Sequence, residues 1–427
     1  MARGDGAALG RPGSGRDDVA AVWRIESARI VATLARATGD VALAEDLAQE
    51  AFAAALVAWP RDGVPHNPAG WLLTVGRRRA VDGYRRRAAL DERYTALARE
   101  LEPGGGAAEA DLLWDPDRID DDLLALMFVA CHPVLSREAQ VVLTLRVLGG
   151  LTSTEIARGL LVPTATVQAR ITRAKKTLAA AQVPFVAPSP EERRQRLGSV
   201  LGVLYLVFTE GSTAATGADL LRPDLAREAV RLTRVLARLV PDVSEVQGLL
   251  ALLELTAARF PARVGQDGEP VLLEDQDRRR WDRAAITRGR AALVRAGQVG
   301  RGLGAYGVQA AIAECHAVAP SVAGTDWDRV VLLYEVLGRL APSPVVDLNR
   351  AVAVSMARGP AAALPVVAAL AAAGELAGSH LLPSVRGELL TRLGRSDEAR
   401  RQLELAVRLC TNEREQGLLR RKLAALG

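Results

Sequence analysis

Cysteine, aromatic residues and long apolar runs are all scarce in this chain. Only 3 of its 427 residues are cysteine, and 4% are aromatic. Cys131, Cys315 and Cys410 lie far apart and form no Cys-x-x-Cys pair, which favours a reduced protein of the cytoplasm. The most apolar run, residues 197–208, is too short to cross a bilayer, so no membrane segment is expected.

Catalytic, metal and targeting motifs are also missing. The chain has no Gly-x-Ser-x-Gly, P-loop or metal-spaced His/Cys pattern, so it is not predicted to be an enzyme and no cofactor is expected. Cys131 and His132 are adjacent, but no second cysteine or histidine lies near them in sequence, which favours a helix end over a metal site. Residues 1–17 are rich in glycine and arginine without an apolar segment, which predicts a disordered N-terminus rather than a signal peptide.

The composition that remains is typical of a helical protein with several domains. Alanine, leucine and arginine dominate, and all three are good helix formers. With 49% hydrophobic residues over 427 positions, two or three cores are expected. The formal net charge of +5 permits a nucleic-acid partner without requiring one. We therefore predict an all-α fold and look for function in where the charges lie.

Residues 151–178 predict two short helices joined by a tight turn. Thr152 and Glu155 fit a capping box at the start of the first helix. Leu161 and Val162 form the predicted turn, and Pro163 opens the second helix, where its missing N–H costs nothing. This pattern is a helix-turn-helix.

The second helix of this motif has an apolar and a basic face. Apolar residues recur at spacings of four, three and four from Val167 to Leu178. No acidic residue occurs between Pro163 and Leu178, and arginine, glutamine and lysine suit base edges and phosphates of a major groove. The alternative is an ordinary helical hairpin with a solvated basic face. The candidate DNA-binding residues are Thr164, Thr166, Gln168, Arg170, Arg173 and Lys175.

Two earlier segments carry charge of opposite sign. The predicted helix after Asp40 has an acidic side with Asp46, Gln49 and Glu50, which suits a basic protein partner or a solvated face. The predicted helix over residues 69–87 combines arginines with aromatic residues, which suits phosphates and the stacking of unpaired bases. Its candidate nucleic-acid residues are Trp71, Arg77, Arg78, Arg79, Tyr84 and Arg85.

Together these motifs resemble an extracytoplasmic-function (ECF) sigma factor of the sigma-70 family. The segment AEDLAQEAF resembles the region 2 helix that docks on core RNA polymerase, and VPTATVQARITRAKKTL resembles the region 4 helix that reads the −35 element. The arginine-rich helix resembles the one that engages the −10 element, and residues 61–67 match the loop that captures a flipped base. The resemblance implies region 2 over 18–88, a linker over 89–119 and region 4 over 120–182. It also implies core polymerase and promoter DNA as partners.

Three positions depart from the family pattern. Pro163 replaces a usual capping serine, Gln168 replaces a common lysine, and Arg78 replaces a common asparagine. These differences bear on which promoter sequence is read, and they leave the role itself unchanged.

Residues 191–427 predict a further helical domain. Its last turns resemble a tetratricopeptide pair, so stacked helix pairs forming an α-solenoid are expected. A group of ECF sigma factors carries such an extension, which we expect to be regulatory, either by binding a protein or by folding back on the sigma domains. Residues 277–297 are among its predicted helices.

Two other functions are compatible with the sequence. One is a promoter-specific activator or repressor that uses the helix-turn-helix without replacing a sigma factor. The other is an enzyme or ligand sensor in the C-terminal domain, where Glu274, Asp275 and Asp277 form an acidic group. The favoured alternative for that group is that Trp281 anchors a helix and the acids pair with the arginines of residues 278–280.

Overall fold

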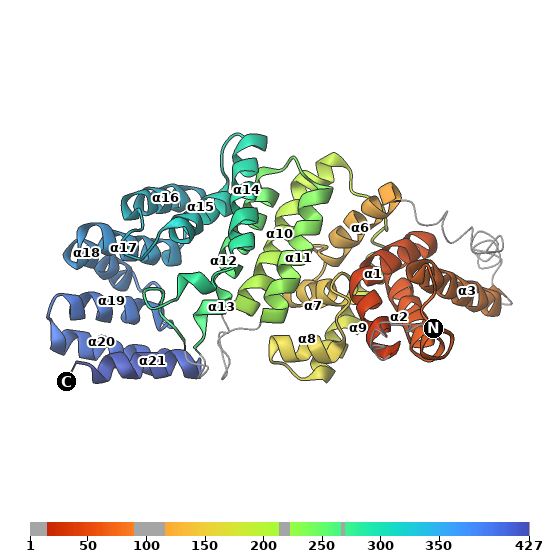
Figure 1. Ribbon diagram of the computed structural model, residues 1–427, viewed down its shortest axis with the longest axis horizontal. Helices are drawn as coiled ribbons and strands as arrows, with labels where there is room; N and C mark the ends of the chain where they lie inside the picture. The colour runs from red at the N-terminus through yellow and green to blue at the C-terminus, as the bar shows by residue number, and fades with distance from the viewer. Residues whose placement is uncertain (1–14, 89–115, 213–222, 266–269, 427) are drawn as a thin grey trace, which may run out of the picture. The chain divides into compact units, whose positions relative to one another are not determined.

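The computed structural model describes residues 15–88, 116–212, 223–265 and 270–426 (Figure 1). Within these ranges the chain is helical, with an isolated β-bridge between Val264 and Pro270. The all-α prediction is confirmed. The chain divides into two compact units, residues 1–203 and residues 204–427. Residues 1–14 of the predicted disordered segment 1–17, and residues 89–115 of the predicted linker 89–119, lie outside the described residues. The remaining residues of both segments are helical, because α1 begins at Gly15 and α6 begins at Pro116.

The first three helices of unit 1 pack on one another. They are α1 (Gly15–Thr38), α2 (Val41–Asp62) and α3 (Pro68–Ala88). Asp40 caps α2 because its side chain accepts hydrogen bonds from the amides of Ala42 and Leu43. At the other end of α2, Gly63 takes a φ of 83°, a conformation that favours glycine.

The rest of unit 1 contains the helix-turn-helix. Its helices are α6 (Pro116–Ala130), α7 (Arg137–Val147), α8 (Ser153–Leu160) and α9 (Thr164–Ala180). The predicted capping box is present: the Glu155 amide donates to Thr152 Oγ1 at 3.2 Å, and the Thr152 amide donates to Glu155 Oε2 at 2.8 Å. Leu161 turns the chain in the left-handed region, with a φ of 52°. The predicted turn is therefore where the sequence pattern indicated.

Helix α10 (Pro190–Ser212) crosses the division between the two units. Its first half is tied to α6, because Arg196 Nη2 donates to the Phe128 carbonyl at 2.7 Å and Ser199 Oγ donates to the Cys131 carbonyl at 3.3 Å. The division after Val203 is thus later than the domain start at residue 191 that the prolines of residues 184–190 suggested.

Unit 2 is a succession of helices in which neighbours along the chain pack together (Figure 1). Helix α12 also packs on α15, and the crossing is close: a Cβ atom at Gly248 would lie 2.6 Å from the Gly307 amide nitrogen. The helices are α11 (Pro223–Leu239), α12 (Ser244–Ala257), α13 (Phe260–Arg263), η1 (Arg278–Arg280), α14 (Arg283–Val299), α15 (Ala305–Val318), α16 (Trp327–Leu340), α17 (Pro344–Arg358), α18 (Pro360–Ala372), α19 (Leu381–Arg392), α20 (Ser396–Leu409) and α21 (Glu413–Ala424).

One predicted helix of this unit is interrupted. Residues 277–297 form a short 3₁₀ turn, η1, and then α14, instead of one continuous helix. Asp277 and Asp282 each cap the segment that follows them, and Trp281 between them has extended backbone angles. The prediction was wrong here because two aspartates within six residues supply two helix starts.

Candidate nucleic-acid and polymerase interface

Helix α9 separates an apolar from a basic face as predicted. Val167, Ile171, Ala174 and Leu178 are all buried and hold the helix against α7 and α8. On the other faces Gln168 and Arg173 are exposed, and Thr164, Thr166 and Arg170 are half-buried. Packing therefore leaves a row of donors and acceptors facing outward from α9.

Lys175 does not belong to that outward row. Its Nζ atom lies 2.6 Å from Glu45 Oε2 and 2.8 Å from Asp46 Oδ1, both on α2. Burial alone would lower the pKa of Lys175, but the charges and hydrogen bonds of Glu45 and Asp46 outweigh burial and raise it. The prediction grouped Lys175 with the DNA-reading residues, whereas in this arrangement it is paired with the predicted polymerase-binding helix.

Glu45 is the centre of this buried ion network. Its side chain is 4% exposed, and Arg146 Nε donates to Oε1 at 2.8 Å while Lys175 contacts Oε2. A carboxylate this deeply buried is stable only when it is paired on several sides. The network joins α2 to α7 and α9, so the predicted regions 2 and 4 contact each other directly.

Helix α1 makes a second set of contacts with the helix-turn-helix half of unit 1. Trp23 Nε1 donates to the Gly150 carbonyl at 3.1 Å, and Arg36 pairs with Asp122 of α6 at 3.0 Å. Gly150 has a φ of 64°, and a Cβ atom there would collide with the Ser27 hydroxyl. The loop before α8 therefore needs glycine both for its backbone and for this packing.

Most of the predicted residues of α3 are accessible, but Tyr84 is not. Arg78, Arg79 and Arg85 are exposed. Trp71 is half-buried and lies edge-on to Trp59, with ring centroids 5.5 Å apart. Arg77, the remaining predicted member, is also half-buried.

Tyr84 is only 4% exposed. It follows Ala80 and Val81 by four and three residues, and both of those are buried on the core face of α3. In this structure the Tyr84 ring therefore packs in the core and is not presented to solvent, where unpaired bases would stack.

The three predicted polymerase-binding residues lie on one stretch of α2. Asp46 and Glu50 are exposed and Gln49 is half-buried. Glu50 pairs with Arg79 of α3 at 2.8 Å, and both side chains are about half exposed. Such an exposed pair contributes little to stability, so a partner can replace it at small cost.

A hollow of about 430 Å³ lies beside the loop that precedes α3. Its lining combines Val22, Ile25 and Glu26 of α1 with residues 66–69 at the start of α3. Asn67 Oδ1 accepts from the Gly70 amide at 2.9 Å, which fixes the start of α3. Polar and apolar side chains, with the Glu26 carboxylate, thus border a space open to a small planar group.

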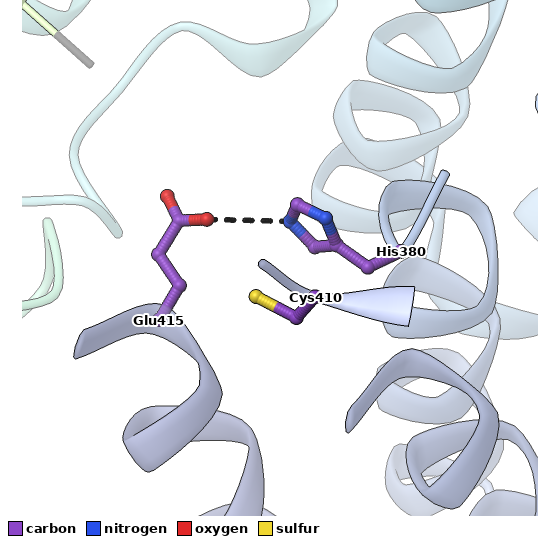
Figure 2. A group of neighbouring side chains, drawn as sticks. All are labelled: His380, Cys410 and Glu415. Carbon is purple, nitrogen blue, oxygen red and sulfur yellow. Dashed lines mark ion pairs between the residues drawn. The ribbon is translucent and has the colours of Figure 1, made fainter. Parts of the chain in front are cut away.

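One group of side chains in unit 2 has the donor set of a metal site (Figure 2). His380, Cys410 and Glu415 come from beside or within α19, α20 and α21, and their ligand atoms all lie within 4.8 Å of one another. His380 Nε2 is 3.3 Å from Glu415 Oε2, and burial raises the pKa of the Cys410 thiol. Zinc takes such ligands with a fourth position open. Spacing along the sequence pointed instead to Cys131 with His132 and to the acidic group of residues 274–277, because His380, Cys410 and Glu415 lie far apart in the chain.

The acidic group that suggested a second site does not converge. Glu274 and Asp275 are exposed, and Asp277 pairs with Arg279 at 3.0 Å. The favoured alternative was that Trp281 anchors this segment and that the acids pair with neighbouring arginines. Trp281 is 2% exposed, and the pairing holds for Asp277. The side chains that lie against the Trp281 ring are those of Arg259 and Arg278, and the sequence did not predict this contact.

Three segments of the chain match known protein families. Residues 24–89 match Sigma-70 region 2, and residues 125–178 match Sigma-70, region 4. Residues 196–297 match a family of unknown function, DUF6596. No solved structure matches the chain.

Relatives of the chain include an uncharacterized protein of Rhizobium meliloti (strain 1021). The two are 45% identical over 388 residues, which are 89% of each chain. The probable ECF RNA polymerase sigma factor SigI of Mycobacterium tuberculosis is 30% identical over 145 residues, which are 34% of this chain and 48% of SigI. None of the helices within the described residues is long and apolar enough to span a membrane.

Proposed function

The chain belongs to the ECF subfamily of the sigma-70 family and is an RNA polymerase sigma factor with a C-terminal helical extension; from this premise we propose how its surfaces divide the work. One surface binds core polymerase, two bind promoter DNA, and the extension regulates. Polymerase makes the RNA, so the chain carries out no catalysis. It acts in the cytoplasm, where polymerase meets promoters.

The outward row of α9 reads the −35 element. The observation that carries this proposal is that packing buries the apolar stripe of α9 and turns Gln168, Arg170 and Arg173 away from the core. Arginine bonds bidentately to guanine, and glutamine bonds to adenine, in the major groove. Thr164 and Thr166 lie in the first turn, where a recognition helix meets base edges. The phosphate contacts make promoter binding strongly dependent on salt.

Helix α3 and the hollow beside it hold the opened −10 element. Arg78, Arg79 and Arg85 supply exposed positive charge for the backbone, with Arg77 and Trp71 partly accessible on the same helix. The hollow lined by His66 and Asn67 accepts one unpaired base. Its mixture of polar and apolar side chains offers contacts to both a base edge and a base face.

Asp46, Gln49 and Glu50 bind core polymerase. Asp46 already pairs with Lys175, and Glu50 with Arg79. A basic polymerase surface that binds these two carboxylates therefore replaces Lys175 and Arg79 as their partners. Because Lys175 is on α9, core binding through Asp46 favours the separation of α9 from α2. That separation also frees Lys175 for DNA phosphates, which links polymerase binding to promoter reading.

The helical extension regulates the sigma domains. Support comes from its division as a separate compact unit and from its successive stacked helices, an architecture typical of protein-binding solenoids. It takes the place of a separate anti-sigma factor by binding a protein or by folding back on the sigma domains.

Run-off transcription with purified core polymerase tests these assignments. Genomic fragments that include the region upstream of this gene serve as templates. New start sites that disappear with Arg170→Ala and Arg173→Ala support the −35 assignment. Sequence-specific duplex binding without any transcript would favour a helix-turn-helix regulator instead. In that case Asp46→Ala and Gln49→Ala would leave activity unchanged.

A further inference from the structure

Three arginines of unit 2 gather around buried aromatic rings, and we call them the arginine cluster. Arg259 follows α12, Arg263 ends α13 and Arg278 begins η1. The guanidinium carbon of Arg278 is 4.4 Å from the centre of the Trp281 ring, and that of Arg259 is 5.5 Å from it. Arg263 lies 5.9 Å from the centre of the Phe260 ring. These contacts bring positive charges to one part of the unit.

Among the described residues, no carboxylate forms an ion pair with the cluster. Arg278 Nη1 donates to the carbonyls of His316 and Ala319, both at 2.8 Å, and Arg263 Nη1 donates to the Ser212 carbonyl at 2.8 Å. Carbonyl acceptors satisfy hydrogen bonds but leave the charge in place. The charge of Glu415 acts on Arg263 and partly offsets the lowering of its pKa by burial, while Glu415 Oε2 also lies 3.3 Å from His380 Nε2.

Burial and mutual repulsion both act on these groups. Burial, followed by the charges of Arg263 and Arg278, lowers the pKa of Arg259 to about 10. Burial and the charges of Arg259 and Arg278 lower the pKa of His316 to about 4. A site that depresses the pKa of every cation within it is a site of strong positive potential.

Four buried polar atoms near Trp281 have no hydrogen-bond partner among the described residues. They are Arg259 Nε, Arg278 Nη2, Trp281 Nε1 and His316 Nδ1. Trp281 is 98% buried, so water does not satisfy its indole N–H from the surface. Unpaired buried polar atoms are rare, and each one needs an explanation. Four of them beside an uncompensated charge are explained together by one missing acceptor.

We propose that the arginine cluster, with the indole N–H of Trp281, is a binding site for a small phosphorylated ligand. A phosphoryl group supplies the negative charge and several acceptor oxygens at once. The planar guanidinium matches a phosphate with two parallel hydrogen bonds, which is why arginine is used for this purpose. Arg259, Arg278 and Trp281 lie in the segment that matches the family of unknown function, so the proposal gives that segment a role. The proposal does not depend on the promoter and polymerase assignments above.

Isothermal titration of the full-length protein, in phosphate-free buffer of constant ionic strength, tests this site. The probes are inorganic phosphate, glucose 6-phosphate and AMP, which separate free phosphate from a sugar ester and a nucleotide. The matched control is Arg279→Gln, because Arg279 is 90% exposed in its side chain and pairs with Asp277. We expect saturable binding of at least one probe by the wild type and by the control. Arg259→Gln should weaken that binding at least tenfold.

Thermal unfolding separates a ligand site from a structural contact. In phosphate-free buffer Arg259→Gln should melt at or above the wild-type temperature, since it removes an uncompensated buried charge. The bound probe should raise the melting temperature of the wild type but not that of the variant. A variant that melts lower by the same amount with and without probe would mean that Arg259 only packs on Trp281.

Three other results would overturn the proposal. One is the absence of saturable binding of all three probes by the wild type. Another is an equal loss of affinity in Arg279→Gln, which would indicate diffuse attraction by surface charge. The third is binding of a 12-nucleotide single strand without binding of any small phosphate, which would assign the cluster to nucleic acid. If Arg259→Gln fails to fold, Arg278→Gln provides the same comparison.

Discussion

Arginine takes three different roles in this chain, and its neighbours decide which. Arg173 is exposed on α9 and faces outward. Arg146 is held by the buried carboxylate of Glu45. Arg259 is packed against Trp281, and no carboxylate among the described residues pairs with it. The same side chain is therefore suited to bind DNA, to stabilise the fold or to bind a ligand, according to whether its charge is solvated, paired or unpaired.

His316 should make stability depend on pH. The unfolded chain takes up a proton at this residue near pH 6.5, whereas the folded chain resists protonation until about pH 4. Between these values the unfolded state binds more protons, so stability falls as the pH falls. The loss attributable to His316 is on the order of 3 kcal/mol.

Urea unfolding of His316→Gln and wild type between pH 7 and pH 4 measures this effect. The difference between them should shrink or reverse as the pH falls, because the variant has no imidazole to protonate. His66→Gln is the matched control, since His66 is exposed. Parallel curves for wild type and His316→Gln would contradict the assignment.

Substitution of Arg170 or Arg173 by alanine should weaken binding to the −35 duplex by roughly ten- to a hundredfold, or about 1–3 kcal/mol. The reason is that each arginine offers paired donors to a base edge or a phosphate. Fluorescence anisotropy with a labelled promoter duplex measures the change, and Arg301→Ala, an exposed arginine of unit 2, controls for net charge. An equal loss in the control would indicate non-specific attraction.

At the scale of helices, charged pairs decide how the two halves of unit 1 meet. The helix-turn-helix is specified locally, by its cap, its turn and its apolar stripe. Its contact with α2 instead depends on Glu45, Lys175 and Arg146, which come from three helices. The energetics of these two kinds of contact can be measured separately.

Glu45→Gln should destabilise unit 1 by about 3–5 kcal/mol, because it leaves two half-buried cations without their shared, buried carboxylate. Glu50→Gln is the matched control: its pair with Arg79 is exposed, and its loss should cost about 0–1 kcal/mol. Chemical denaturation of both variants measures the difference. Similar costs for the two variants would show that the Glu45 network is solvated rather than buried.

Thr152→Ala should cost about 1 kcal/mol through loss of the α8 cap. The Glu155 amide would lose its acceptor, and α8 is too short to compensate with its own hydrogen bonds. Denaturation gives the stability change, and Thr152→Ser, which keeps the hydroxyl, is the control. Equal destabilisation by serine and alanine would point to packing rather than capping.

At the scale of the whole molecule, the place at which the two units divide determines how the extension can be tested. A truncation at residue 190 would remove Arg196 and Ser199, which hold the first half of α10 to unit 1. Residues 1–203 are therefore the better comparison with the full chain.

If the extension replaces an anti-sigma factor, residues 1–203 should produce more transcript than the full chain. Run-off transcription at matched protein concentration, with the same core polymerase and template, measures this. Circular dichroism of the truncated chain confirms that its helices are intact. Equal transcript from both chains, with the same start sites, would remove the regulatory proposal.

The sequence by itself determined the features that depend on neighbours within a few positions. The cap at Thr152, the turn at Leu161 and the buried stripe of α9 follow from helical spacing and from side chains that hydrogen-bond nearby amides. The family resemblance rests on two such motifs in order, and residues 24–89 and 125–178 match the corresponding sigma families. Helix caps, turns and helical spacing can be predicted from the sequence because the residues involved are close neighbours along the chain.

Only the tertiary structure decided which charges meet across the chain. Lys175 lies 130 positions from Glu45, so helical periodicity could not separate it from the DNA-facing row. Tyr84 is buried because α3 turns that face toward its neighbours, although its arginine-rich surroundings indicated exposure. The arginine cluster and the group of His380, Cys410 and Glu415 likewise join separate segments. Spacing along a helix predicts which residues share a face, but only packing determines what that face contacts.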